Sequence, residues 1–198
     1  MNLHSMAKKI AFFLVRKEIV IEDKAEIYSY GLEILFATVI NGILVAAASL
    51  LLGVFWQSVL MLVPFMLVRA NAGGFHAETH TGCMLGFLTV YLSCVLFAKN
   101  LPPGAVGPVA LAGLLTGAAI ILAVGPLPHK NRPVSNRELA AYRIKARLLA
   151  LGLLIAGLAG LYFAPAWFLY FVLGLDIAAE SLLAGCIKAN GKGCEKND

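Results

Sequence analysis

Two long stretches of the chain, residues 34–54 and residues 105–124, contain no charged residue at all. A helix needs about 20 predominantly apolar residues to cross the hydrocarbon core of a bilayer, and both stretches reach that length. Inside lipid, every backbone N–H and C=O group must be paired within its own segment or within a closed barrel. Because neither stretch alternates apolar and polar residues as a barrel strand does, the sequence predicts membrane-spanning helices.

The composition extends this prediction to the whole chain. Hydrophobic residues make up 60% of the sequence and charged residues 14%, so one soluble core cannot bury the apolar surface. We therefore predict an all-α, polytopic membrane protein with about six transmembrane helices, of which the second and third are short. The six apolar segments are residues 34–54, 55–68, 84–98, 105–124, 148–163 and 167–187.

Residues 1–30 differ from these segments because cations and apolar side chains alternate there at roughly helical spacing. That pattern suits an amphipathic helix in the headgroup region, and equally one that packs against the rest of the protein. We treat residues 1–198 as a single integral membrane domain. It comprises an interfacial amphipathic helix (1–30), a helical membrane bundle (31–187) and a polar tail (188–198).

The positions of Lys and Arg predict the orientation. If the N-terminus is cytoplasmic and six segments cross, only Lys99 of the sixteen cations lies outside. The positive-inside rule then places both termini on the cytoplasmic side, together with residues 69–83 and the loop 125–147. The net charge of +5 follows from this sidedness, and we expect the lipid bilayer, not nucleic acid, as the partner of these charges.

The sequence RANAGGFHAETHTGC, residues 69–83, interrupts the apolar pattern between the second and third segments. If its second half is helical, His76, His80 and Cys83 share one face. An imidazole can take the proton of a neighbouring thiol and so produce a nucleophilic thiolate. Either histidine can therefore activate Cys83.

Other interpretations of the same stretch remain open at this point. His76, His80 and Cys83 also supply three metal ligands, although HAETH is not the zinc-protease motif HExxH. Gly73 and Gly74 can form an oxyanion site or simply break the helix where the second segment leaves lipid. A purely structural polar loop is the third alternative.

Two further features lie inside the apolar segments. Asp176 and Glu180 are four residues apart in the sixth segment, and we expect them to face the bundle interior. An ion pair with a cation such as Arg69 is the favoured interpretation, and a contact to substrate or to His76 is the alternative. Glycines in the fourth and fifth segments predict close helix packing: Gly107, Gly113, Gly117, Gly152, Gly157 and Gly160.

The chain resembles the AgrB family of bacterial quorum-sensing membrane endopeptidases. The resemblance rests on an Arg, then Ala-Gly-Gly, one residue, His-Ala, and a Cys seven residues after that His. A second block, with Pro126, Asn131, Arg132, Pro133 and Glu138, resembles the proline-containing cytoplasmic loop of the family. The residues that match the first motif are Arg69, Ala72, Gly73, Gly74, His76, Ala77 and Cys83.

The resemblance implies a cysteine endopeptidase of the bacterial cell membrane that removes the C-terminal tail of an AgrD-like precursor peptide. It implies that Cys83 is the nucleophile and His76 the base, with Arg69, Gly73 and Gly74 as supporting residues. His80 has no role in the family pattern. No metal or other cofactor is implied, and the bilayer and a homodimer are further partners that we consider. The basic loop is expected to hold the acidic precursor tail, through Lys130, Arg132, Arg137 and Arg143.

The cyclised product of such a reaction is a thiolactone or lactone autoinducing peptide. An internal Cys or Ser of the precursor would attack the enzyme thioester to close the ring. The alternative function is a small metal-handling or transporter-like membrane protein that uses His76, His80 and Cys83 as ligands or proton carriers, together with Asp176 and Glu180.

Overall fold

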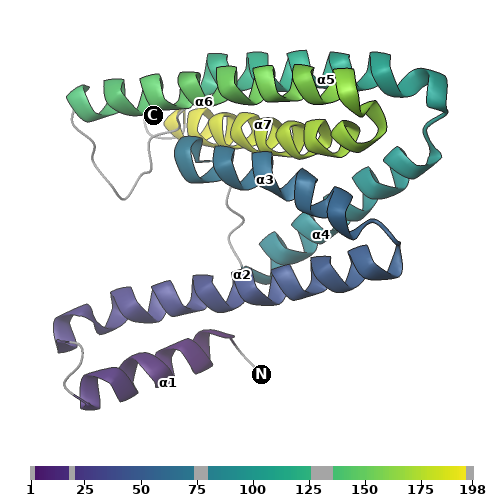
Figure 1. Cartoon of the computed structure of the whole chain (residues 1–198). Helices are drawn as coiled ribbons and strands as arrows, with labels where there is room; N and C mark the ends of the chain where they lie inside the picture. The colour runs from purple at the N-terminus through teal and green to yellow at the C-terminus, as the bar shows by residue number, and fades with distance from the viewer. Residues whose placement is uncertain (1–2, 18–20, 74–79, 126–135, 195–198) are drawn as a thin grey trace. The chain divides into compact units, whose positions relative to one another are not determined.

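The computed structural model describes residues 3–17, 21–73, 80–125 and 136–194 (Figure 1). All regular secondary structure in these ranges is helical, which confirms the all-α prediction. The elements are α1 (Leu3–Arg16), η1 (Glu22–Lys24), α2 (Ala25–Leu51), α3 (Phe55–Ala72), α4 (His80–Asn100), α5 (Pro103–Val124), α6 (Asn136–Phe163) and α7 (Pro165–Cys194).

Six of these helices, α2 to α7, are long and apolar enough to cross a membrane. The protein is therefore a multi-pass membrane protein, as predicted. The spans in α3 (Phe55–Ala72, 18 residues) and α4 (Gly82–Asn100, 19 residues) are the two shortest. Both helices reach into the polar stretch between the second and third segments: α3 continues through Arg69 to Ala72, and α4 already includes His80 and Cys83.

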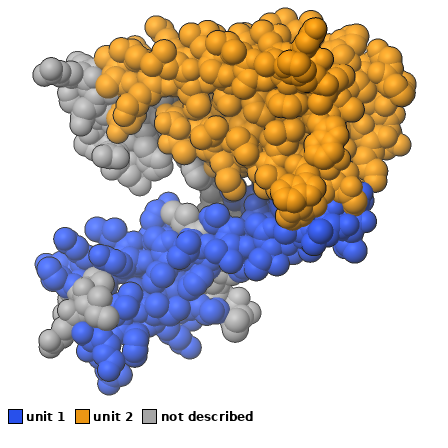
Figure 2. Space-filling model, in the orientation of Figure 1, with its two compact units in different colours: residues 1–52, 77–89 blue, residues 53–76, 90–198 orange. Residues whose placement is uncertain are grey.

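The chain divides into two compact units, coloured separately in Figure 2: residues 1–52 with 77–89, and residues 53–76 with 90–198. In unit 1, α1 packs along α2, to which η1 joins it. Ala7 and Ala11 on α1 are buried, as are Ala25 and Ser29 at the start of α2. Small residues at i and i+4 let two helices approach closely, so α1 turns its alanine face inward. The N-terminal helix is thus packed against the protein, one of its two predicted settings.

Unit 2 is built around α7. Half of the α7 span is buried, compared with at most 28% of any other span. In Figure 1, α7 lies between α3 on one side and α5 and α6 on the other, and it packs against all three. Leu175, Ala178 and Leu182 of α7 are fully buried in the core. A helix apolar on nearly every face is what a central position requires.

The contacts between helices fix their directions within unit 2. Met61 lies against Gly174, and Arg69 further along α3 lies against Ser181 further along α7, so these two helices run parallel. A Cβ built on Gly125 would lie 3.6 Å from the Cβ of Ala72 and 3.9 Å from that of Ala146. The C-terminal ends of α3 and α5 therefore meet the N-terminal half of α6 at one end of unit 2.

One buried polar contact joins α3 to the second half of α4. The hydroxyl groups of Ser58 and Tyr91 are 2.6 Å apart and share a hydrogen bond, and the Tyr91 side chain is fully buried. In an apolar interior each hydroxyl would otherwise lose its hydrogen bond to water, so the pair satisfies both. This contact connects Tyr91 of α4 to α3 within unit 2.

Close packing through glycine is confirmed at some of the predicted positions. A Cβ at Gly157 would come within 2.6 Å of Leu114, and one at Gly160 would overlap the ring of Phe168. At Gly107 and Gly152 the prediction is wrong, since nothing in the described part of the chain lies within 4 Å of an added Cβ. These two glycines face outward and carry no packing constraint.

A close approach of backbone to backbone, at Gly174, was not predicted. A Cβ there would overlap the carbonyl group of Met61, which belongs to the α3 backbone and cannot rotate away. Only a glycine allows α7 to lie this close to α3. The α3–α7 contact therefore depends on a single missing methyl group.

We predict that Gly174→Ala lowers the free energy of unfolding by about 1–3 kcal/mol, because the added methyl group separates the two backbones. Thermal unfolding of the protein in detergent, followed by circular dichroism, measures this loss. The matched control is Gly152→Ala on α6, where the Cβ enters open space and alanine favours the helix. Equal melting temperatures for the two variants would contradict the close contact.

Candidate functional site

Cys83 lies in the first turn of α4, which begins at His80. Its thiol is free and half-buried. His80 and Cys83 are three residues apart in the same helix, as predicted for the backbone, and the shared face of their side chains stays a prediction. His76 and Gly74 lie outside the described residues, and their part of the predicted arrangement stays a prediction. The backbone N–H groups of a first helical turn have no partner within the helix and favour negative charge nearby.

Gly73 ends α3. Its φ of 81° and ψ of −148° belong to a backbone region that L side chains rarely adopt. Its N–H group donates a hydrogen bond to the carbonyl oxygen of Arg69 at 3.2 Å, which closes the last turn. The helix break considered for this glycine is thus observed. The chain leaves α3 at a fixed point, directly before the segment that carries His76.

Arg69 connects this end of α3 to α7. Its Nη1 donates a hydrogen bond of 2.7 Å to the Oγ of Ser181, and its guanidinium lies 5.9 Å from the centre of the Phe65 ring. A hydrogen bond from a charged donor in a partly buried setting is stronger than a neutral one. Sequence reasoning missed Ser181, because a single serine 112 residues away in an apolar segment gives no sign of its partner.

Asp176 lies against the bare backbone of α5. A Cβ at Gly113 would come within 2.6 Å of its Oδ2, and one at Gly117 within 2.7 Å of its Oδ1. The two glycines therefore leave the space that this carboxyl group occupies. Arg69, one of the ion-pair partners considered for Asp176, donates a hydrogen bond to Ser181 on the same helix as Asp176. Asp176 is half-buried inside the bundle, as expected for an ionisable residue at membrane depth.

Glu180 follows Asp176 by one helical turn and is exposed. Asp176 and Glu180 lie near each other and near the thiol of Cys94 on α4, close enough for their charges to interact. Asp176, Glu180 and Cys94 therefore form one group of titratable side chains within unit 2. Their neighbourhood was not visible from the sequence, because Cys94 and Asp176 lie on helices far apart in the chain.

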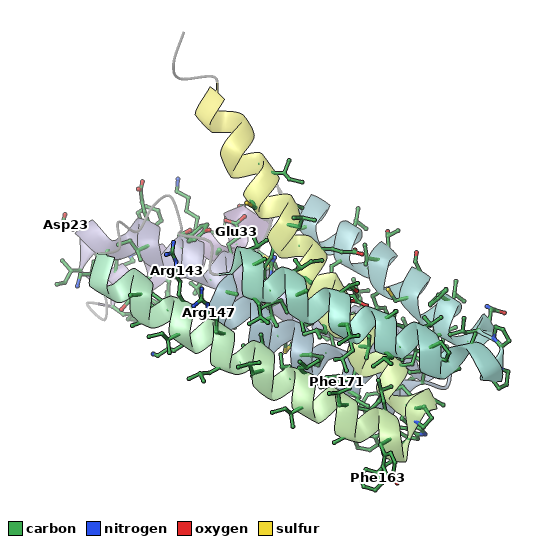
Figure 3. All side chains as sticks on the ribbon, turned by 90° about the horizontal axis from the view of Figure 1, so that it is seen from above. Asp23, Glu33, Arg143, Arg147, Phe163 and Phe171 are labelled. Carbon is green, nitrogen blue, oxygen red and sulfur yellow. The ribbon has the colours of Figure 1, made fainter. Side chains whose placement is uncertain are left out.

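The basic residues of α6 gather at one end of that helix. Arg143 and Arg147 are labelled towards one end in Figure 3, and Phe163 marks the other. Arg143, Lys145 and Arg147 are exposed, and the Nζ of Lys145 lies 6.0 Å from the centre of the Tyr142 ring. Gly125 lies against both Ala146 of α6 and Ala72 of α3, so this basic end lies near the Gly73 end of α3. Lys130, Arg132 and the side chain of Arg137 lie outside the described residues.

Comparison with known proteins bears on this arrangement. The sequence model of the family described as AgrB, accessory gene regulator B, matches residues 7–183 of the chain. The match spans all six membrane helices through most of α7 and includes both motifs identified in the sequence. No curated protein and no solved structure matches the chain.

We predict that Arg69 and Ser181 stabilise the protein as a pair. Removing the hydroxyl in Ser181→Ala leaves a partly buried guanidinium without this acceptor, which costs about 1–3 kcal/mol of unfolding free energy. Ser181→Thr keeps the hydroxyl and is the matched control. Thermal unfolding of Arg69→Gln, Ser181→Ala and the double variant gives their coupling energy. Strictly additive losses would contradict the contact.

Proposed function

The chain belongs to the accessory gene regulator B family, and we propose that it is a Cys/His endopeptidase that processes an AgrD-like precursor peptide. Family membership makes it a multi-pass membrane protein of the accessory gene regulator system, which serves quorum sensing. The observation that carries the finer proposal is the position of Cys83. It is a free, half-buried thiol in the first turn of a membrane helix, at the end of the matching motif.

In the first step, the sulfur of Cys83 attacks the carbonyl carbon at the junction between the signal peptide and its C-terminal tail. His76 accepts the proton of the Cys83 thiol, and the resulting thiolate is the attacking nucleophile. The C–N bond of the peptide breaks, and His76 donates the proton that the leaving amine requires. The tail departs, and a thioester joins Cys83 to the remaining peptide.

In the second step, a Cys thiol or Ser hydroxyl within the bound peptide attacks the thioester carbonyl. The bond between the carbonyl carbon and the Cys83 sulfur breaks, and the thiol of Cys83 is restored. The product is a thiolactone or lactone ring, the form expected of an autoinducing peptide. Water competes for the same thioester, so exclusion of water decides between a cyclic and a linear product.

The position of Cys83 on α4 supports the exclusion of water from the thioester. Its thiol is half-buried, and α4 is continuous from His80 to Asn100, so the nucleophile is carried on a membrane span rather than on a free loop. A group on a helix is held more precisely than one on a loop. We propose that the site lies at the cytoplasmic surface of the cell membrane, since the positive-inside rule assigns the basic end of α6 to that side.

The basic end of α6 is the proposed binding site for the acidic precursor tail. Arg143, Lys145 and Arg147 are exposed there, and the proposal also includes Arg137 of α6 and the preceding sequence neighbours Lys130 and Arg132. The contacts of Gly125 with Ala146 and with Ala72 support this role, because they put the α6 cations at the end of unit 2 where α3 leads into the motif. Exposed cations attract an acidic segment at long range and weakly at contact.

We expect Cys83→Ser and His76→Ala each to abolish cleavage of the precursor, since the nucleophile and the proton donor are then missing. Cleavage of the precursor by the protein in proteoliposomes, resolved by mass spectrometry, measures this. Cys94→Ser and Cys186→Ser are matched controls, because these thiols lie outside the motif, and both should retain activity. His80→Ala should reduce the rate only mildly. Metal dependence with equal loss at His76, His80 and Cys83 would favour the metal-handling alternative.

Neutralising Arg143 and Arg147 to Gln should raise KM for the precursor by roughly two- to fivefold per cation, the range expected of exposed ion pairs. The value of kcat and the rate at which chloroacetamide alkylates Cys83 should stay unchanged. Lys99→Gln, at the C-terminal end of α4, is the matched control. An unaltered KM, with no dependence on salt, would remove the proposed binding role.

A further inference from the structure

The outward face of α1 has no role in the proposed reaction. A shallow open groove on this helix is lined by Ser5, Lys8, Lys9, Phe12, Phe13 and Arg16. At 100° per residue, these positions lie on the side of α1 opposite to the buried Ala7 and Ala11. The helix therefore packs on α2 through alanine and presents cations and phenyl rings on its other side.

The chemistry of this face is one-sided. α1 contains three cations and no acidic residue. Lys8, Lys9 and Arg16 are exposed, and so are the two rings between them, Phe12 at 51% and Phe13 at 56%. Just past the helix, the Nζ of Lys17 lies 5.9 Å from the centre of the Phe13 ring. A ligand for such a face must carry negative charge and must also accept apolar rings.

The depth of α1 follows from the length of α2. A helix of 27 residues is about 40 Å long, whereas the hydrocarbon core is about 30 Å thick, so about two turns of α2 extend beyond it. The surplus belongs at its N-terminal end, where Glu26, Tyr28, Tyr30 and Glu33 interrupt the apolar pattern. η1 joins α1 to this same end. The C-terminal end of α1, which η1 joins to the start of α2, therefore lies at the level of the lipid headgroups.

We propose that the outward face of α1 binds anionic phospholipid. The ammonium and guanidinium groups of Lys8, Lys9 and Arg16 hold the phosphates, and the rings of Phe12 and Phe13 enter the boundary between headgroups and acyl chains. An acidic peptide would satisfy the cations but would leave two exposed phenyl rings in water. Anionic phospholipid satisfies both requirements, because its phosphate carries negative charge and its acyl chains accept the rings.

Quenching by brominated lipids tests this site directly. A single reporter is placed on the face by Phe12→Trp in a full-length protein that also carries Trp56→Phe and Trp167→Phe. The protein is reconstituted with brominated phosphatidylglycerol or brominated phosphatidylcholine at equal mole fraction. We expect stronger quenching by phosphatidylglycerol, and we expect that preference to weaken as ionic strength rises.

Neutralising Lys8, Lys9 and Arg16 tests whether these cations cause the preference for phosphatidylglycerol. Combined Lys8→Gln, Lys9→Gln and Arg16→Gln should lower the relative affinity for phosphatidylglycerol by roughly fivefold per cation. The matched control is Arg143→Gln, Lys145→Gln and Arg147→Gln, which makes the same change in net charge on exposed positions of α6 and should leave the preference intact. Far-UV circular dichroism verifies that both variants keep their helical content.

Four results would overturn the proposal. Equal quenching by the two lipids would show that the cations do not select anionic headgroups. A preference that survives the triple substitution on α1 would assign the selectivity to another surface. If neither lipid quenches the reporter and its fluorescence changes when acidic precursor peptide is added, a peptide occupies the face. If neither lipid quenches it and its fluorescence changes with protein concentration, a second copy of the chain occupies the face.

Discussion

The contact between α3 and α7 at Gly174 is the constraint on which unit 2 depends. Because the Met61 carbonyl lies where a Cβ would stand, the two helices touch backbone to backbone. Association of helices in lipid gains little from the hydrophobic effect and relies on packing and hydrogen bonds, so this closeness matters. It also brings Arg69 within reach of Ser181, seven residues further along α7. The absence of a methyl group at Gly174 lets α7 touch α3 at Met61, and this contact helps to position the last turn of α3, about two turns further along.

This arrangement connects the C-terminal helix to the motif. Arg69 contributes twice to the end of α3: its carbonyl accepts the Gly73 N–H, and its guanidinium bonds Ser181. The chain therefore enters the segment of His76 from a helix end that is held both by its own backbone and by α7.

The helical architecture was predictable because a long apolar segment in lipid has few alternatives to a helix, and the number of spans followed from six such segments.

The packing of the helices was predictable only in part. Gly113, Gly117, Gly157 and Gly160 were expected to make close contacts and do so, but Gly107 and Gly152 look the same in the sequence and face open space. Gly174 was missed, since a lone glycine does not reveal which backbone it meets. Ser181 and Cys94 were missed for the same reason: their partners come from helices far away in the chain. In the candidate site, the thiol and the helix break at Gly73 followed from local sequence, whereas the tie to α7 required the fold.

Two separate observations bear on the end of unit 2 at which α3 and α5 terminate. The distribution of cations predicts that the basic end of α6 faces the cytoplasm, through the energetics of charge transfer across the membrane. The contacts of Gly125 with Ala72 and Ala146 bring the motif end of α3 to that same end of unit 2 without any reference to charge. The parallel course of α3 and α7 adds Lys188 to this end, since it follows Ser181 by about two turns. Packing therefore puts the C-terminal end of α3, from which the chain enters the motif, at the basic end of α6 within unit 2. The proposed function needs the motif and these cations on the same side of the membrane, and the contacts of Gly125 support that requirement for the α3 end of the motif.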